Sequence, residues 1–566
     1  MANFYSRYIF FSTSPRNPML VPEYLKIIQE NGLENKIYNN SLQEKFYEVL
    51  SESEITKDHN TGNAKDKAFA GRDKMTRLPQ TLGFLIPMSK KPLEITPAGK
   101  LLMNNLLFED VFTHQLLKFQ LPSPLHKESK ENKGYFNIKP FLELLRLIYK
   151  LEYLTYQELE LYGMSMTDYH DFDKTVENIK AFRKERNHRR GNINLKKFYA
   201  EKRLNHYKLI YKDLLEKEKF KTRESTTSNE KEYMKKKLNN LADYTDSVFR
   251  SLKSTGLLVL TRGKSLKISQ ERLKEVEYIL KYIPREGIKN KMKKEEYLRI
   301  ISNPTEPKLL LDNPTYLKKE LDKYNITSPS QRIYDMKLSL YKKYQKKRYD
   351  VMTKITYQLK KREQEDIDDI INVFQQIKNN ELLDSATMLE WNTWRAANMI
   401  NHGNIIGNFI PDDNGYPISH ATGNQGDIVG DYGKFSIVFE VTLTRGKRQY
   451  DAEGEPVPRH VGSIRSKTGK ESFGIFIANP PSKETIYHFY MTTLSNSEIY
   501  GGSVNIIPFS IDEFIKFFKK SIEKDITAED LYSIHKNSVR ISKDGFINNR
   551  TETDWYRETL KYIYDN

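Results

Sequence analysis

The spacing of apolar residues divides the chain into three parts. Up to about residue 285, helical patterns alternate with short apolar runs, and from about 290 to 380 apolar residues such as Ile333, Met336 and Leu340 recur three and four positions apart within polar sequence. After residue 380, apolar runs typical of buried strands alternate with helices. The pattern predicts a multidomain α+β protein with an N-terminal region 1–285, a helical linker 286–378 and a C-terminal α/β domain 379–566.

Two segments of the N-terminal region predict a helix followed by a pair of strands. In residues 66–107 a helix through Lys74–Leu82 precedes an apolar run, a polar turn and a second helix, for which Thr96 is the expected N-cap and Pro97 the first helical residue. Residues 229–269 repeat the arrangement, with a basic helix, the run Leu257–Leu260, a turn at 262–264 and the strand 265–268. Both patterns predict winged-helix-like subdomains.

The C-terminal domain predicts a sheet flanked by helices. A helix runs through Met388–Trp394, and the most hydrophobic strand of the region is Phe435–Thr442. Further strands are expected at 473–478 and 503–507, followed by a helix at about 511–522. The three-residue spacing of Trp391 and Trp394 places both rings on one helix face, which favours core packing over base stacking.

Composition limits the available chemistry. The 566 residues contain no cysteine, so disulfides, thiolate nucleophiles and Cys-ligated zinc are excluded, and carboxylates and histidines remain as metal ligands. Any bound metal is therefore expected to be a hard cation. No run of about 18 apolar residues occurs, and residues 1–7 lack the pattern of a secretory signal, so a cytoplasmic, membrane-free protein is expected. The abundance of Lys, Asn and Ile is typical of an AT-rich prokaryotic genome.

The charge of the chain is unevenly distributed. The net charge is +17, but residues 381–566 carry about −5, so the preceding residues carry about +22. A basic region binds phosphates by releasing their counterions, whereas an acidic region that approaches the same polyanion requires a role for its carboxylates. Divalent metal binding is one such role. The alternative is a basic protein joined to an ordinary acidic domain.

The most basic stretch lies between the two predicted winged-helix segments, at 182–203. Its side chains are expected to contact DNA phosphates, and the alternative is a solvated helix face. The candidate DNA-binding residues are Arg16, Arg72, Lys74, Arg183, Arg186, Arg189 and Arg190.

Two carboxylates of the C-terminal domain form a candidate metal site. Asp427 and Glu440 are thirteen residues apart, so a turn at 430–434 can bring them together on adjacent strands. With the carbonyl of Val441 they offer the oxygen ligands that Mg²⁺ prefers. An Asp at one strand and a Glu ending the next resembles the PD-(D/E)xK nuclease core. The usual Lys of that motif is here Thr442, so water activation must rest on other groups, for which Glu390, Glu453, Glu455, Arg459 and His460 are the candidates.

Longer motifs extend this resemblance over nearly the whole chain. They are Glu-Trp-x-x-Trp at 390–394, His-Ala-x-Gly-Asn-Gln-x-Asp at 420–427, Glu-Val-Thr at 440–442 and Glu-x-Glu-Pro-Val-x-Arg-His at 453–460. The N-terminal half agrees in Ser-Pro-Arg at 14–16, Arg-Asp at 72–73, Gly-Phe at 83–84 and Ile-Thr-x-Ala-Gly-Lys at 95–100. The chain resembles the AlwI family of type IIS restriction endonucleases and their nicking relatives.

The resemblance implies a function and roles for individual residues. It implies binding to a short asymmetric site in double-stranded DNA, Mg²⁺-dependent cleavage a few bases to one side, and a cognate DNA methyltransferase. Asp427, Glu440 and Val441 become metal ligands, with Glu390, Glu453 and His460 completing the catalytic set. The family shares the Val-Thr departure from the Lys-containing motif, so the missing Lys does not argue against activity, although it leaves the general base unassigned. His460 is equally compatible with a structural or phosphate-contacting role, and the alternative for Glu390 is a solvated helix glutamate.

Two other functions compete with this one. A DNA-binding regulator that retained a nuclease-like fold only for its shape would not need Asp427, Glu440 and Glu390, which are all present. An RNA-binding or RNA-cleaving protein is disfavoured, because tandem winged helices suit duplex DNA better than the stacking platforms used for RNA. With one metal site per chain, we expect a monomer that nicks, and a second cut that requires transient dimerisation of nuclease domains on DNA.

Overall fold

The chain forms two compact units. The computed structural model describes residues 4–53, 64–188, 195–218, 220, 229–261, 265–288, 292–379, 381–382, 384–400, 403–420 and 425–565. Unit 1 comprises Met1–Val49 and Asp66–Lys346, and unit 2 comprises Leu50–Lys65 and Lys347–Asn566. Both contain helices and sheet, which confirms the predicted mixed α+β, multidomain class.

Unit 1 is mainly helical. Its helices are α1 (Val21–Glu30), α2 (Asn40–Glu52, whose last residues belong to unit 2), α4 (Lys67–Thr76), α5 (Leu78–Thr81), α6 (Pro97–Leu102), α7 (Phe108–Lys118), α8 (Pro140–Leu151), α9 (Tyr156–Glu158), α10 (Phe172–His188), α11 (Leu195–Ile210), α12 (Lys212–Glu216), α13 (Glu230–Lys253), α14 (Leu273–Tyr282), α15 (Lys294–Ile301) and α16 (Pro314–Lys323). Its strands form a pair, β1 (Leu85–Ile86) with β2 (Glu94–Ile95), and a three-stranded sheet in the order β3 (Leu154–Thr155), β5 (Ser265–Ile268), β4 (Leu258–Thr261).

The predicted helix-and-strand orders occur in both N-terminal segments. Helices α4 and α5 precede the antiparallel pair β1–β2, and α6 follows it; the hydroxyl of Thr96 accepts a hydrogen bond from the Gly99 amide at 3.1 Å, as expected of an N-cap. In the second segment α13 leads into the antiparallel strands β4 and β5. Strand β5 also pairs with β3, which the sequence did not predict. The expected turn at 262–264 lies outside the described residues.

Helix α17 (Ile333–Leu359) runs through the division between the units at Lys346. Of its predicted apolar residues, Met336 and Leu340 are buried and Ile333 is exposed. Lys337 is held by Asp110 at 2.8 Å and Asp312 at 2.6 Å, both within unit 1. Helix α18 (Gln364–Lys378) instead contributes Ile370 and Phe374 to the core of unit 2. The segment predicted as a linker therefore packs into the cores of both units.

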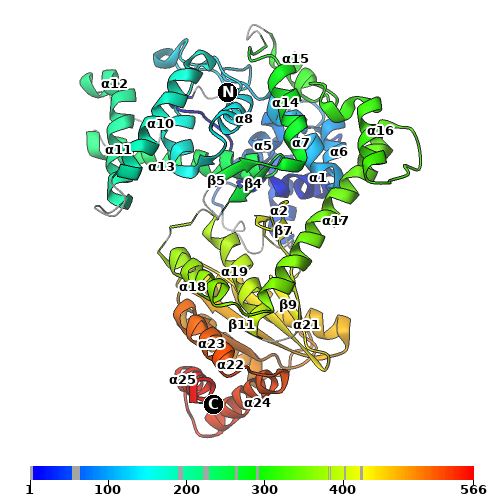
Figure 1. The fold of residues 1–566 in the computed structure, drawn as a ribbon, viewed down its shortest axis with the longest axis vertical. Helices are drawn as coiled ribbons and strands as arrows, with labels where there is room; N and C mark the ends of the chain where they lie inside the picture. Colours follow the sequence, from blue (N-terminus) through cyan, green and yellow to red (C-terminus); the bar gives the residue numbers. More distant parts are fainter. Residues whose placement is uncertain are drawn as a thin grey trace. The chain divides into compact units, whose positions relative to one another are not determined.

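Unit 2 is a five-stranded sheet between two layers of helices (Figure 1). The strand order is β12 (Ile506–Ser510), β11 (Glu471–Ala478), β10 (Phe435–Val441), β9 (Ile428–Asp431), β6 (Asn404–Gly407). Strands β10, β11 and β12 are parallel, whereas β9 is antiparallel to both neighbours. A separate hairpin joins β7 (Ile410–Pro411) and β8 (Pro417–Ser419). The other helices are α19 (Ser385–Ile400), α20 (Lys447–Glu453), α21 (Pro456–Thr468), α22 (Lys483–Leu494), α23 (Ile511–Glu523), α24 (Ala528–Ile547) and α25 (Glu552–Asp565).

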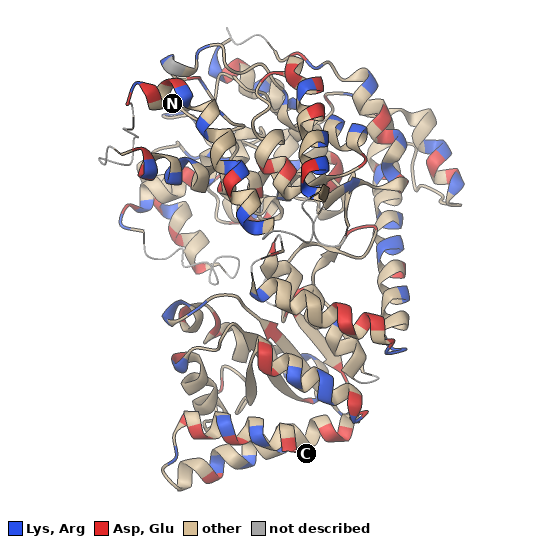
Figure 2. Ribbon diagram, turned by 60° about the vertical axis from the view of Figure 1, so that its left-hand side comes forward, with Lys and Arg blue, Asp and Glu red and all other residues tan. Residues whose placement is uncertain are grey.

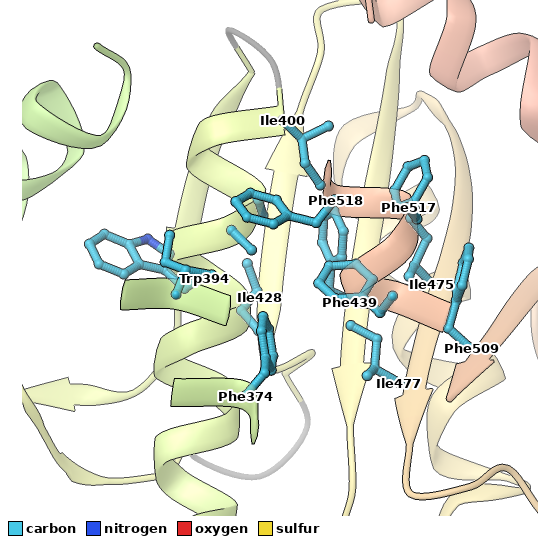
Figure 3. Close-up of a cluster of buried hydrophobic side chains, with 14 of the residues drawn as sticks. Phe374, Trp394, Ile400, Ile428, Phe439, Ile475, Ile477, Phe509, Phe517 and Phe518 are labelled. Atoms are coloured by element: carbon cyan, nitrogen blue, oxygen red, sulfur yellow. The ribbon is translucent and has the colours of Figure 1, made fainter. Parts of the chain in front are cut away.

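Alternate residues of β10 face different cores. Ile437 and Phe439 belong to a cluster with α18, α19 and α23, part of which Figure 3 shows around Phe439, Phe517 and Phe518. Val438 instead packs with Val457 and Val461 of α21 on the opposite face of the sheet. Because side chains alternate along a strand, Glu440 shares the face of Val438. This alternation places Glu440 beneath α21 rather than among the phenylalanines.

Charged residues of both signs are distributed over the helices of both units (Figure 2). Along α17 the basic residues outnumber the acidic ones, which are Asp335 and Asp350. None of the described helices combines the length and apolar character needed to cross a bilayer.

Candidate active site

Asp427 and Glu440 occupy the positions directly beyond the last residue pair of the β9–β10 ladder. Ile428 pairs with Phe439 in this antiparallel ladder, so the next position of the register sets Asp427 against Glu440. Directly opposed residues project from the same face of a sheet. The predicted hairpin is thus confirmed, and its register brings the two carboxylates together.

Asp427 is half-buried and surrounded by negative charge. One carboxylate oxygen accepts a hydrogen bond from the Val441 amide at 2.9 Å. Burial, reinforced by the charges of Glu390, Glu440 and Glu453, raises the pKa of Asp427 well above its ordinary value, while the Val441 amide acts in the opposite direction. A carboxylate that is costly to ionise beside other carboxylates creates a strong preference for a cation.

Glycine at position 426 leaves the space that Glu440 occupies. A Cβ at this position would meet the Val438 side chain at 2.4 Å and the Glu440 carboxylate at 3.1 Å. The Gly426 carbonyl also accepts a hydrogen bond from the Asn408 amide group at 2.6 Å. The backbone before Asp427 is therefore fixed against β10, with no room for a side chain.

Glu440 is buried and hydrogen-bonded to a histidine from α21. The Nδ1 atom of His460 lies 2.7 Å from a Glu440 carboxylate oxygen, and both side chains are at least nine-tenths buried. Glu453, at the end of α20, contributes to the negative potential at Asp427. His460 and Glu440 are thus in direct contact, and Glu453 acts on Asp427 through its charge.

Glu390 reaches the same site from α19. Its side chain is 6% exposed and contacts Nδ1 of His420 through a short hydrogen bond. The other ring nitrogen of His420 lies 2.9 Å from the hydroxyl of Thr387, which is fully buried. Glu390 is therefore not a solvated helix glutamate. His420 stood within a recognised motif, but the sequence alone gave no indication that it contacts Glu390.

The donor set fits a hard divalent cation. Within the described ranges, no three Asp, Glu or His side chains converge as a preassembled metal cluster. Mg²⁺, however, commonly takes only one or two carboxylates and keeps several waters. The opposed carboxylates of Asp427 and Glu440 meet that requirement. Thr442, which occupies the place of the usual Lys, is buried and supplies no cation.

The predicted DNA-binding residues differ in their surroundings. Arg72 is exposed and stacks over Phe69 at 4.8 Å, and Arg16 is 47% exposed while paired with Asp243 at 2.9 Å. Lys74 lies over the Tyr24 ring at 5.8 Å, and burial lowers its pKa. All three residues belong to unit 1. Their exposure is compatible with phosphate contacts for Arg72 and Arg16, and less so for Lys74.

Arg183 is held inside the protein. Its guanidinium makes two hydrogen bonds of 2.9 Å to Glu158, which is fully buried, and a further one of 2.7 Å to the Tyr153 carbonyl. Arg186 contacts the same Glu158 at 3.4 Å. Arg189 and Arg190 lie outside the described residues. The inward geometry assigns Arg183 a structural function, joining α10 to the segment that follows α8.

Trp391 and Trp394 are buried, which confirms core packing. Trp391 donates to the Gly415 carbonyl at 2.9 Å, and Trp394 contacts Phe409 edge to face.

Comparison with known proteins gives one family. The model described as AlwI restriction endonuclease matches residues 80–517. Among solved structures, the small subunit of the heterodimeric restriction endonuclease R.BspD6I is 27% identical, with a TM-score of 0.29, over 35% of this chain and 97% of its own. The BpuJ1 endonuclease binding domain, solved with modified DNA, is 13% identical, with a TM-score of 0.32, over 50% of this chain and 92% of its own. Among the curated proteins there is no significant match.

Proposed function

The chain belongs to the AlwI restriction endonuclease family, and from this premise we propose that it is a type IIS or nicking endonuclease that depends on Mg²⁺. It would bind a short asymmetric site in duplex DNA and hydrolyse phosphodiesters a few bases away. The observation that carries the proposal is the opposition of Asp427 and Glu440 at the end of one hairpin, with Glu390 and Glu453 close enough to raise the pKa of Asp427.

We assign the metal ligands to Asp427, Glu440 and the Val441 carbonyl. When bound, Mg²⁺ would polarise the scissile phosphodiester and lower the pKa of the attacking water. Within the chain, His460 fixes the Glu440 carboxylate, and the Val441 amide fixes that of Asp427. Glu390 and Glu453 add the negative potential that favours a cation at this point. The order of helix α19, antiparallel strands β6, β9 and β10, helix α21 and parallel strand β11 supports a PD-(D/E)xK core.

We assign base recognition to unit 1. The order of α4, α5, β1, β2 and α6 and that of α13, β4 and β5 support two winged-helix-like subdomains. The exposed Arg72 and Arg16 are the candidates for phosphate contacts, and the excess of positive charge before residue 381 would draw the polyanion to this unit.

One site of this kind positions one phosphodiester. We therefore propose a monomer in solution that nicks one strand, and a second cut that needs a transient dimer of nuclease domains. A cognate DNA methyltransferase would protect the host sequence, and both proteins would act in a prokaryotic cytoplasm.

The decisive experiment compares Asp427→Ala and Glu440→Ala with the parental protein. Supercoiled plasmid is incubated with Mg²⁺, and the ends of the products are sequenced to locate the site. Both variants should bind the site with nearly parental affinity and leave the plasmid uncut. Asp431→Ala, which removes a carboxylate paired with Lys470 at the other end of β9, is the matched control and should cut normally.

Two results would contradict the proposal. Parental cutting by either active-site variant would remove the assignment of the metal ligands. A parental protein that binds its site without cutting under any divalent cation would instead favour the DNA-binding regulator.

A further inference from the structure

The β7–β8 hairpin is fastened to helix α19. The indole of Trp391 donates to the carbonyl of Gly415 at 2.9 Å and stacks on Tyr416 with 4.8 Å between ring centres. Gly415, with φ of +81°, forms the turn, and the Asp412 carboxylate caps it by accepting from the Tyr416 amide at 3.0 Å. Strand β8 ends at Ser419. These contacts deliver the next residue, His420, to the N-terminal half of α19.

Both ring nitrogens of His420 face partners on or beside α19. Nδ1 contacts Oε1 of Glu390, and Nε2 lies 2.9 Å from Oγ1 of Thr387. The Thr387 hydroxyl donates in turn to Oδ1 of Asp384 at 2.8 Å. Glu390 is 6% and Asp384 3% exposed, whereas His420 is 36% exposed. His420 therefore joins two buried carboxylates while retaining an edge in solvent.

The numbers of donors and acceptors on these side chains fix the direction of the contacts. Thr387 has a single hydroxyl proton, which it gives to Asp384, so it accepts from Nε2–H of His420. The remaining ring nitrogen, Nδ1, contacts Oε1 of Glu390, so the ring bridges the Thr387 hydroxyl and the Glu390 carboxylate.

Glu390 needs such a restraint because it stands beside other carboxylates. Helix α19, which carries Glu390, packs against strands β9 and β10, where Asp427 directly precedes β9 and Glu440 lies near the end of β10. Mutual repulsion favours rotation of the Glu390 side chain away from Asp427. The Nδ1 contact opposes that rotation, and the hairpin that Trp391 holds keeps the ring in place.

We propose that His420 is a positioning residue that acts through Glu390, holding its carboxylate toward the site formed by Asp427 and Glu440. The inference rests on the proposed function, since it presumes that Glu390 takes part in cleavage. In this proposal the β7–β8 hairpin places His420 against α19.

The first test measures single-turnover nicking of plasmid carrying one site, at saturating Mg²⁺ and protein. His420→Leu should nick about 10- to 100-fold more slowly, as is usual when a partner that orients an active-site ligand is lost, with site affinity unchanged. His420→Asn, whose amide can donate to Glu390, should restore most of the rate. His170→Asn, at a histidine of unit 1 that is 68% exposed, is the control and should nick at the parental rate.

The second test distinguishes a positioning role from general damage to the fold. If His420 acts through Glu390, then adding His420→Leu to Glu390→Gln should slow nicking by no more than about twofold further, because residues that act as one unit are not additive. If His420→Leu does not fold, Thr387→Val removes the acceptor of Nε2 and should give a smaller loss with the same non-additivity.

Three outcomes are decisive. Parental nicking by a folded His420→Leu would overturn the inference, and so would a full, additive loss in the Glu390→Gln background. Cleavage that survives Asp427→Ala would instead show that the proposed function has its site elsewhere. Slow nicking by His420→Leu, rescue by Asn and non-additivity with Glu390→Gln together support it.

Discussion

Replacing Asp427 with Asn should stabilise unit 2 while abolishing cleavage. The amide has the shape of the carboxylate and can still accept from the Val441 amide, but it carries no charge. The substitution therefore removes one negative charge from a group of four carboxylates and leaves the packing unchanged. Active sites that hold like charges together commonly trade stability for function.

The register of the hairpin gives the magnitude. Side chains at opposed positions of an antiparallel pair have Cβ atoms roughly 5 Å apart, so we take about 6 Å as the separation of the two carboxylate charges. At an effective dielectric constant of about 20, their repulsion is roughly 3 kcal/mol. The partial exposure of Asp427 and the His460 contact of Glu440 reduce this figure to on the order of 1–2 kcal/mol. For a unit of this size the gain is about 2–8 °C in unfolding midpoint.

The sign of the pH dependence follows from the raised pKa of Asp427. Below the ordinary aspartate pKa, the Asp427 carboxyl is protonated in both the folded and the unfolded parental protein. The Asn variant then has no advantage in the free energy of unfolding. As the pH rises above that value, the unfolded chain ionises first, so the folded parental protein loses stability until the raised pKa is passed. The advantage of Asp427→Asn should therefore grow with pH across this window and then remain constant.

Tryptophan fluorescence isolates the relevant unfolding event, because the three tryptophans, Trp391, Trp394 and Trp555, all belong to unit 2. In urea titrations with EDTA from pH 4.5 to 8.5, the free energy of unfolding of Asp427→Asn should exceed that of the parental protein by an amount that grows with pH. Added Mg²⁺ should then stabilise the parental protein and not the variant, since only the folded parental site binds it. Equal or lower stability of Asp427→Asn at every pH, together with equal Mg²⁺ effects, would refute the reasoning.

Four other outcomes are expected. Arg183→Ala should destabilise unit 1 by about 3–5 kcal/mol, measured by urea unfolding followed by circular dichroism, because it leaves the buried Glu158 without its main partner. Arg72→Ala should leave stability unchanged but lower site affinity and reduce the slope of log affinity against log salt by about 0.9, which filter binding at several salt concentrations would detect. Gly426→Ala should impair nicking more than binding, because its Cβ would meet Val438 at 2.4 Å and Glu440 at 3.1 Å. Plasmid with a single site should pass through a nicked form before linearisation, with a second rate that rises with protein concentration; direct, concentration-independent linearisation would contradict the monomeric nicking scheme.

Local signals in the sequence predicted the parts of the fold that depend on neighbouring residues. The Thr96 cap, the hydrophobic strand β10 and the β9–β10 hairpin all follow from side-chain types within a few positions. Strand β12 begins a few residues later than expected, because Val504, which precedes it, is apolar and buried like the residues within the strand. The pairing of β3 with β5 joins residues more than a hundred positions apart, and no local pattern encodes such a contact.

The contacts of the candidate site likewise fall into those that the local sequence predicts and those that depend on distant packing. Asp427 and Glu440 could be paired because one turn separates them, whereas the contact between His420 and Glu390 depends on the packing of a hairpin against a helix. Charge alone also does not reveal which partner a basic residue has: Arg183 belongs to the most basic stretch, and its guanidinium binds the buried Glu158. A basic residue that neutralises an internal acid has the same letter in the sequence as one that meets a phosphate.

The pairing of Asp427 with Glu440 depends on which face of the sheet each side chain occupies. Along β10, even-numbered positions face α21 and odd-numbered ones face the phenylalanine-rich core. A slip of a single residue would set Phe439 or Val441 against Asp427 and turn Glu440 toward that core. An insertion in the hairpin that preserves the alternation keeps Glu440 on its face of the sheet, whereas one that shifts it by a single residue removes Glu440 from that face. Under the proposed division of roles, such a one-residue change in chain length would abolish cleavage without altering the sequence of unit 1.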